Sequence, residues 1–110
     1  MNGNEEFVVN VNDITWVAGK TGLMRKSLVD LPNGPKARLV RIESGEVVPR
    51  HKHPSNEIMY VLEGVLEMHG AVYGPGTCYY KPKDWFYGPL TTKTGVSVLL
   101  FFDGPDAVQI

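Results

Sequence analysis

The sequence predicts an all-β domain, a small sandwich or barrel with almost no helix. Twelve glycines and eight prolines interrupt the 110 residues, so almost no segment offers the run of about ten or more helix formers that an isolated helix needs. Between these interruptions, short segments either alternate apolar with polar residues or are rich in β-branched and aromatic residues, which is typical of strands. Turn signals separate the segments at short intervals, which favours a sandwich or barrel.

Six strands are expected in chain order. They cover residues 7–12 (FVVNVN), 37–43 (ARLVRIE), 58–64 (IMYVLEG), 65–70 (VLEMHG), 77–81 (TCYYK) and 96–102 (VSVLLFF). Glycine-containing turns separate them, at residues 33–35 (NGP), 63–64 (EG), 69–70 (HG) and 74–76 (GPG). A chain of this length cannot bury two independent cores, so we expect one domain over residues 1–110, with fraying at the first few and last few residues.

Composition and charge exclude several classes of protein. Eleven basic and twelve acidic residues give 11 − 12 = −1, so we expect no nucleic-acid partner. The longest apolar run, residues 96–102, is far shorter than the roughly 20 residues of a membrane span, and MNGNEEF lacks the features of a signal peptide. We therefore expect a cytoplasmic protein with no membrane partner. A single cysteine, Cys78, cannot form an internal disulfide and is expected to be a buried packing residue.

Two histidines and a glutamate form the most specific polar group. His51 and His53 lie two residues apart on an extended segment, so both imidazoles point to one face. A turn at residues 54–56 would let Glu57 open the next strand and meet them from the neighbouring position. Two imidazoles and a carboxylate suit Fe(II), Mn, Ni, Co or Zn and leave coordination positions open. The alternative for the tripeptide alone is a chance grouping on a surface strand.

The spacing of these residues resembles a known family. Gly45, His51, His53, Glu57 and Gly64 match, without a gap, the first signature motif of the cupin family. The resemblance covers about residues 37–102, the expected barrel core. It implies a double-stranded β-helix, or jelly-roll barrel, with two antiparallel sheets. It also implies that the two histidines and Glu57 bind a divalent transition metal, with Fe(II) favoured and Zn, Mn, Ni or Co as alternatives.

A narrower resemblance is to the ChrR-type cupin branch. It rests on Trp16, Gly22, Leu28 and the run at residues 37–64. That branch includes the cupin domain of anti-sigma regulators and small dioxygenases that cleave β-diketones or hydroxyacetophenones. The resemblance implies a homodimer and, in enzymatic members, carbon–carbon cleavage that uses Fe(II) and molecular oxygen.

The second cupin motif departs from the family at Tyr87. Five residues after Pro82, where the family has a further metal-binding histidine, this chain has tyrosine, and the following residues 88–89 (GP) match the branch. Tyr87 could bind the metal as a phenolate, donate a hydrogen bond beside a three-ligand site as a catalytic residue, or mark a barrel that has lost its metal and kept a binding role. We favour the second interpretation. His69, in a predicted turn, is expected to be solvated rather than a ligand.

Two functions remain open. One is a metal-dependent dioxygenase acting on a small diketone-like or aromatic ketone substrate. The other is a non-catalytic regulatory cupin that binds a small molecule or a metal. Trp85 and Phe86, beside Tyr87, either form the apolar mouth of a pocket with neighbouring side chains or pack in the core and interface, and Arg50 is expected to face outward. The patterns of activated-serine hydrolases, thioredoxin-like proteins and P-loop proteins are missing.

Overall fold

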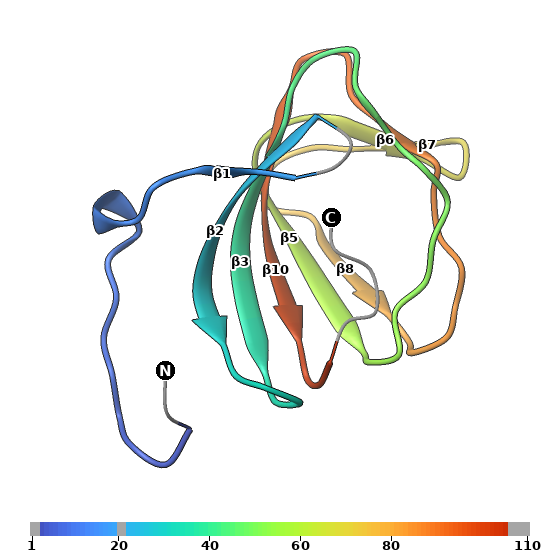
Figure 1. Cartoon of the computed structure of the whole chain (residues 1–110). Helices are drawn as coiled ribbons and strands as arrows, with labels where there is room; N and C mark the ends of the chain where they lie inside the picture. Colours follow the sequence, from blue (N-terminus) through green and yellow to red (C-terminus); the bar gives the residue numbers. More distant parts are fainter. Residues whose placement is uncertain (1–2, 20–21, 106–110) are drawn as a thin grey trace.

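The computed structural model describes residues 3–19 and 22–105, which form two antiparallel β-sheets that face each other (Figure 1). One sheet has the strand order β1-β2-β3-β10-β5-β8, and the other has the order β4-β9-β6-β7. The predicted fold class is confirmed: within the described residues the helical content is one short 3-10 turn, η1 (Val11–Asp13). No helix in this part of the chain is long and apolar enough to cross a membrane.

The strands are short, as predicted. The six-stranded sheet consists of β1 (Val17–Ala18), β2 (Leu23–Asp30), β3 (Lys36–Ile42), β10 (Val96–Phe102), β5 (Glu57–Gly64) and β8 (Cys78–Lys81). The four-stranded sheet consists of β4 (Val47–Val48), β9 (Leu90–Thr91), β6 (Leu66–Met68) and β7 (Ala71–Tyr73). Five of the six predicted strands are confirmed, as β3, β5, β6, β8 and β10, and the predicted turns separate them.

The strand predicted at residues 7–12 is wrong. Residues 7–10 are an arm without a strand partner that runs away from the barrel (Figure 1), and Val8 is 95% exposed. The side chain of Asn10 accepts a hydrogen bond from the backbone N–H of Asn12 at 2.9 Å and so caps the 3-10 turn that follows. The alternation of valine and asparagine is thus explained by a local cap and an exposed arm.

The sequence pattern did not reveal β2, which forms the next-to-edge strand of the larger sheet. Its interior, MRKS, breaks the apolar alternation because polar side chains stand on both faces. The strand nevertheless pairs with β3 over nearly its whole length, from Leu23 opposite Ile42 to Asp30 opposite Lys36. Pairing with β3, rather than the alternation of its own side chains, therefore makes β2 a strand.

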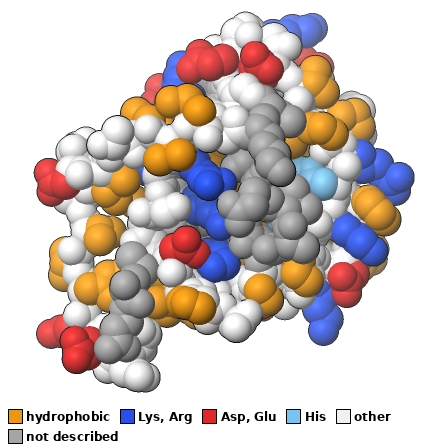
Figure 2. Space-filling view, viewed as in Figure 1, with side chains coloured by type: hydrophobic (Ala, Val, Ile, Leu, Met, Phe, Trp, Pro, Cys, Tyr) orange, Lys and Arg blue, Asp and Glu red, His pale blue; other side chains and the backbone are white. Residues whose placement is uncertain are grey.

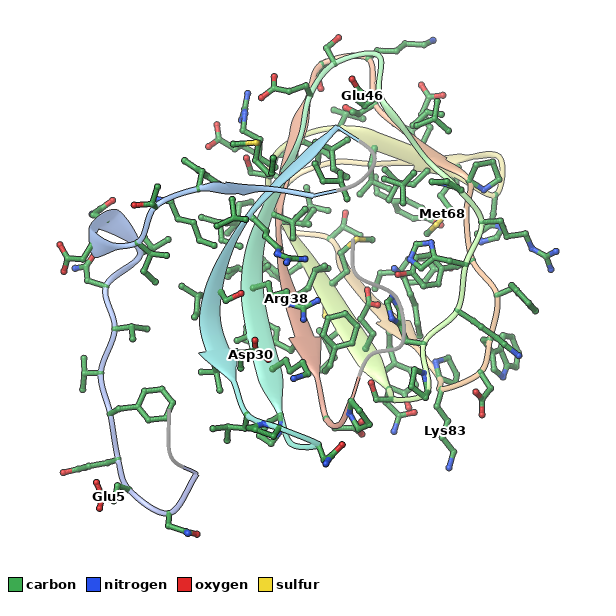
Figure 3. All side chains as sticks on the ribbon, viewed as in Figure 1. Glu5, Asp30, Arg38, Glu46, Met68 and Lys83 are labelled. Atoms are coloured by element: carbon green, nitrogen blue, oxygen red, sulfur yellow. The ribbon has the colours of Figure 1, made fainter. Side chains whose placement is uncertain are left out.

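The core lies between the two sheets. Alternate residues of β3, β5 and β10 point inward in register, so that Val98 of β10 lies opposite both Val40 and Val61. The smaller sheet covers them with Val48, Leu66, Met68 and Leu90. Figure 3 shows Met68 and Arg38 in the space between the sheets, whereas Glu5 lies far outside on the arm.

Candidate functional site

Tyr87 and His51 are held opposite each other by the backbone. The His51 N–H donates to the Tyr87 carbonyl at 3.0 Å, and the Tyr87 N–H donates to the His51 carbonyl at 2.9 Å. This isolated antiparallel bridge brings the two side chains to the same interior face of the barrel, with ring centroids 4.3 Å apart. Tyr87 therefore stands beside the first histidine of the motif, although 36 residues separate them in the chain.

Glu57 opens strand β5, as predicted, and pairs with a residue that the sequence analysis did not single out. Lys81, on β8, lies directly opposite Glu57 in the strand register. Its Nζ donates to Glu57 Oε2 at 3.0 Å, and the exposed fractions of the two side chains are 4% and 1%. A buried charge requires a partner of opposite charge, and this lysine is the partner. Alternation along β8 places Lys81 inward, but only the register between β5 and β8 shows that it contacts Glu57.

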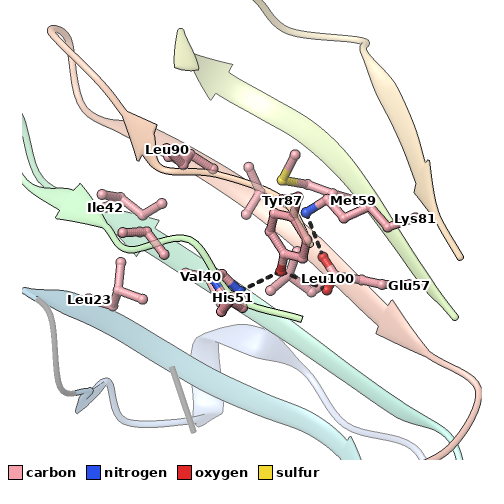
Figure 4. A pocket seen from close by; sticks show the side chains of 12 residues that line it. Leu23, Val40, Ile42, His51, Glu57, Met59, Lys81, Tyr87, Leu90 and Leu100 are labelled. Carbon is pink, nitrogen blue, oxygen red and sulfur yellow. Dashed lines mark hydrogen bonds and ion pairs between the residues drawn. The ribbon is translucent and has the colours of Figure 1, made fainter. Parts of the chain in front are cut away.

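The hydroxyl of Tyr87 is the centre of the polar cluster (Figure 4). Its Oη lies 2.7 Å from His51 Nε2 and 3.0 Å from Glu57 Oε1. It also lies 3.1 Å from His53 Nε2. His53 Nε2 is in turn 3.4 Å from Glu57 Oε1. The four residues named by the two motifs are thus brought together, and both histidines point to one face as predicted.

The protonation of the cluster follows from its surroundings. His51 Nδ1 lies 2.7 Å from the Pro49 carbonyl, which can only accept, so Nδ1 carries a proton. Burial lowers the pKa of His51. Its Nε2 is therefore unprotonated, and the lone pair of this nitrogen is directed at Tyr87 Oη. Burial, and then the carboxylate of Glu57, raise the pKa of Tyr87 far above its ordinary value. Tyr87 is therefore a neutral phenol, and its single proton faces two acceptors, Glu57 Oε1 and His51 Nε2.

These residues do not fit a metal ion in this arrangement. Within residues 3–19 and 22–105, no three His, Cys, Asp or Glu side chains are placed so that they could hold one. The Tyr87 hydroxyl lies within hydrogen-bond distance of all three predicted ligands, so it already engages the atoms with which a metal would form bonds of about 2.0–2.2 Å. Tyr87 was expected beside a three-ligand site, and instead its hydroxyl lies inside the predicted ligand set.

Two cavities meet at Lys81 and Tyr87. An interior cavity of about 20 Å³ is lined by these two residues, His51, Glu57 and apolar core side chains. Because a water molecule needs roughly 10–15 Å³, this cavity has room for one water and for no organic molecule. A second pocket, of about 120 Å³, shares the same two residues and is otherwise lined by Tyr79, Tyr80, Pro82, Trp85 and Phe86.

The second pocket fits the predicted aromatic mouth in part. Trp85 and Phe86 are largely exposed, at 68% and 49%, and so form a mouth rather than core packing. Met59 and Val61, on the neighbouring strand β5, were also candidates for this mouth but are buried in the core.

Positive charge borders this pocket. The guanidinium of Arg50 lies 4.4 Å from the Phe86 ring centroid, and Lys52 Nζ lies 5.0 Å from it. Both side chains are exposed, as is Lys83, which confirms the outward position predicted for Arg50. Figure 2 shows lysine and arginine side chains gathered along the right-hand edge of the molecule, the edge at which Figure 3 labels Lys83.

The remaining candidates are placed on the surface. His69 is exposed in the turn between β6 and β7, with a left-handed φ of 53°, as predicted for a solvated side chain. Cys78 is exposed on β8, so the expectation of a buried packing thiol was wrong. The cause is strand parity: Lys81 and Tyr79 take the inward positions of β8, which turns Cys78 to the outer face.

Comparisons with known proteins agree with the fold. A family model described as the ChrR cupin-like domain matches residues 4–106, whereas a comparison with curated protein sequences gave no significant match. Among solved structures, KdgF from Halomonas sp. is 23% identical over 94% of this chain and 96% of its own, with a TM-score of 0.76. A putative acetylacetone dioxygenase from Methylibium petroleiphilum is 13% identical over 96% and 88%, with a TM-score of 0.80. A chain from the complex of Rhodobacter sphaeroides SigE with the anti-sigma ChrR is 22% identical over 86% and 50%, with a TM-score of 0.69.

Proposed function

Because this chain belongs to the ChrR cupin-like domain family, we propose that it is a binding cupin that takes a small planar organic anion in its aromatic pocket and does not transform it. The observation that carries this proposal is the set of side chains that line and border the pocket. It is walled by aromatic side chains, bordered by cations and closed at its base by Lys81 and Tyr87.

The size and chemistry of the pocket support a ligand of one ring. A cavity of about 150 Å³ with apolar walls accepts benzene, and this pocket has about 120 Å³. Trp85 and Phe86 offer ring faces for stacking, while Arg50 and Lys52 attract negative charge to the entrance. An aromatic or conjugated carboxylate satisfies both features.

The interior supports binding over catalysis. The cavity beside His51 and Glu57 has about 20 Å³, so a diketone cannot reach their side chains without displacing core residues. Lys81 and Tyr87, with exposed fractions of 4% and 5%, separate that cavity from the aromatic pocket. A ligand in the aromatic pocket therefore contacts Lys81 and Tyr87 but neither of the two histidines.

Benzoate is a suitable probe, with benzyl alcohol as the neutral control of similar size. In proton–nitrogen correlation spectra, benzoate should shift the indole N–H of Trp85 saturably and leave that of Trp16 in place. Benzyl alcohol should bind more weakly, because it lacks the charge that Arg50 and Lys52 attract. Trp85→Ala should abolish the response in the neighbouring backbone amides. Shifts that do not saturate, or that survive Trp85→Ala, would contradict the proposal.

A metal-dependent dioxygenase of diketone-like or aromatic ketone substrates is the second candidate. The orientation of His51 favours it: Nδ1 donates to a backbone carbonyl and Nε2 points inward, as in metal-binding histidines. Oxygen uptake after addition of Fe(II) and acetylacetone tests this candidate. Uptake that scales with bound iron and disappears in His51→Ala would replace the binding role with an enzymatic one, and no uptake across a diketone panel would support binding.

We also propose that the chain forms a homodimer through the outer face of the six-stranded sheet. Ile58 lies between Phe101 and Tyr80 in the strand register, and Tyr60 and Leu62 continue the same face along β5. All five side chains are at least 40% exposed, and grouped exposed apolar side chains of this kind often mark a protein–protein interface. A groove of about 690 Å³ lies on this face. Sedimentation should give a dimer at micromolar concentration and a monomer for Ile58→Glu, and a monomeric wild type would refute the assembly.

A further inference from the structure

We infer that Tyr87 and Lys81 together take the place of a metal ion, so that the centre of this barrel is a metal-independent polar cluster. The hydroxyl of Tyr87 joins the side chains, and the ammonium of Lys81 supplies the positive charge. This inference concerns the interior cluster alone and does not depend on which ligand the aromatic pocket binds.

Tyr87 performs the joining role. Its hydroxyl is within hydrogen-bond distance of three groups at once, at 2.7, 3.1 and 3.0 Å. A phenol hydroxyl offers one proton and its lone pairs. It donates to Glu57 or to the lone pair of His51, and it can accept from His53. Because Tyr87 is fixed by a two-bond backbone bridge to His51, the hydroxyl occupies this point as part of the fold.

Lys81 performs the charge role. Its Nζ contacts Glu57 Oε2 at 3.0 Å and lies 3.3 Å from the centroid of the Tyr87 ring. The same ammonium therefore neutralises the carboxylate and holds the phenol ring by a cation–π interaction. Its position also comes from the backbone, since Lys81 and Glu57 are partners in the β5–β8 register.

Charge balance explains why the arrangement excludes a cation. The buried carboxylate of Glu57 is already paired with the buried side-chain nitrogen of Lys81, at 3.0 Å. A divalent ion added beside them would leave two positive charges uncompensated in a buried region, which is unfavourable. It would also have to displace the Tyr87 hydroxyl from between its partners.

The test is a set of four proteins titrated with Co(II): wild type, Tyr87→His, Lys81→Met and the double variant. Wild type should bind no Co(II) saturably, and its melting temperature should not change with chelator or with Co(II). The double variant should bind Co(II) roughly 100-fold or more tightly than Tyr87→His, because a unit positive charge next to a divalent ion has been removed. Adding His51→Ala to the double variant should abolish this binding.

A conservative variant separates the role of charge from that of shape. Lys81→Arg retains the cation and should remain as indifferent to Co(II) as wild type. Saturable Co(II) binding by wild type, or a double variant that binds no more tightly than Tyr87→His, would overturn the inference. The wild-type titration decides the question even if the double variant does not fold, and none of these readouts depends on the binding of benzoate.

Discussion

Removal of the buried ammonium is the sharpest test of the polar cluster. Lys81→Met keeps the length and apolar stem of the side chain but leaves Glu57 with no cation. The Glu57 side chain is 1% exposed and its Oε2 loses a charge-assisted hydrogen bond of 3.0 Å. Breaking one partner of such a buried pair costs about 3–5 kcal/mol, because an uncompensated charge remains in the interior.

The expected change in melting temperature follows from the length of the chain. Unfolding entropy near 60 °C is about 2.1 cal/mol/K per residue, which for 110 residues gives about 0.23 kcal/mol/K. A loss of about 3–5 kcal/mol therefore lowers the melting temperature by about 13–22 °C. Lys83→Met is the matched control, because Lys83 is exposed two residues further along the chain and its substitution should change stability by less than about 0.5 kcal/mol.

Calorimetry or thermal melting followed by circular dichroism measures these changes, and a double-mutant cycle assigns them. Adding Glu57→Gln to Lys81→Met removes the stranded charge, so the double variant should recover at least half of the loss. Strictly additive losses would show that the two side chains do not interact. A Lys81→Met protein that melts within a few degrees of wild type would refute the buried ion pair.

Three further predictions concern pH and the turns around the site. Burial lowers the pKa of His51 below 6.5, so the unfolded chain binds this proton at a higher pH than the folded chain does. This part of the stability is complete above about pH 6.5 and is lost as the pH falls towards the lowered pKa; melting at a series of pH values should show it, and an identical acid dependence in His51→Gln would contradict it. Gly64 has a φ of +78°, and an added Cβ would overlap the carbonyl oxygen of Gly95. Gly64→Ala should therefore lower the free energy of unfolding in urea by more than the 1–2 kcal/mol of left-handed strain alone, and a smaller loss would mean that the Gly95 turn can move. Asp103 accepts hydrogen bonds from the backbone N–H and the side chain of Asn56, at 3.0 and 2.7 Å, and Asp103→Ala should lower the same free energy by about 1–3 kcal/mol. No loss would show that these exposed bonds add nothing to the turn before Glu57.

The sequence by itself determined the β-rich character of the chain and the position of its chemistry. Alternation and β-branched residues located β3, β5 and β10, because each of these strands buries one face along most of its length and the side-chain period of a strand is two. The same period put His51 and His53 on one face. The motif spacing also singled out Tyr87, which the backbone bridge of the structure places opposite His51.

Only the tertiary structure decided what these side chains do. The partner of Glu57 is Lys81, 24 residues away, and no local pattern indicates that β5 and β8 align these two positions. Likewise, the tyrosine was predicted beside a metal site, whereas its hydroxyl lies inside the ligand set because the bridge to His51 aims it there. Residues 7–12 had the right alternation but no strand to pair with, and β2 had a strand to pair with but no alternation. Local propensity depends on neighbours in the chain, whereas strand register, burial and the compensation of charge depend on residues that only the fold brings together.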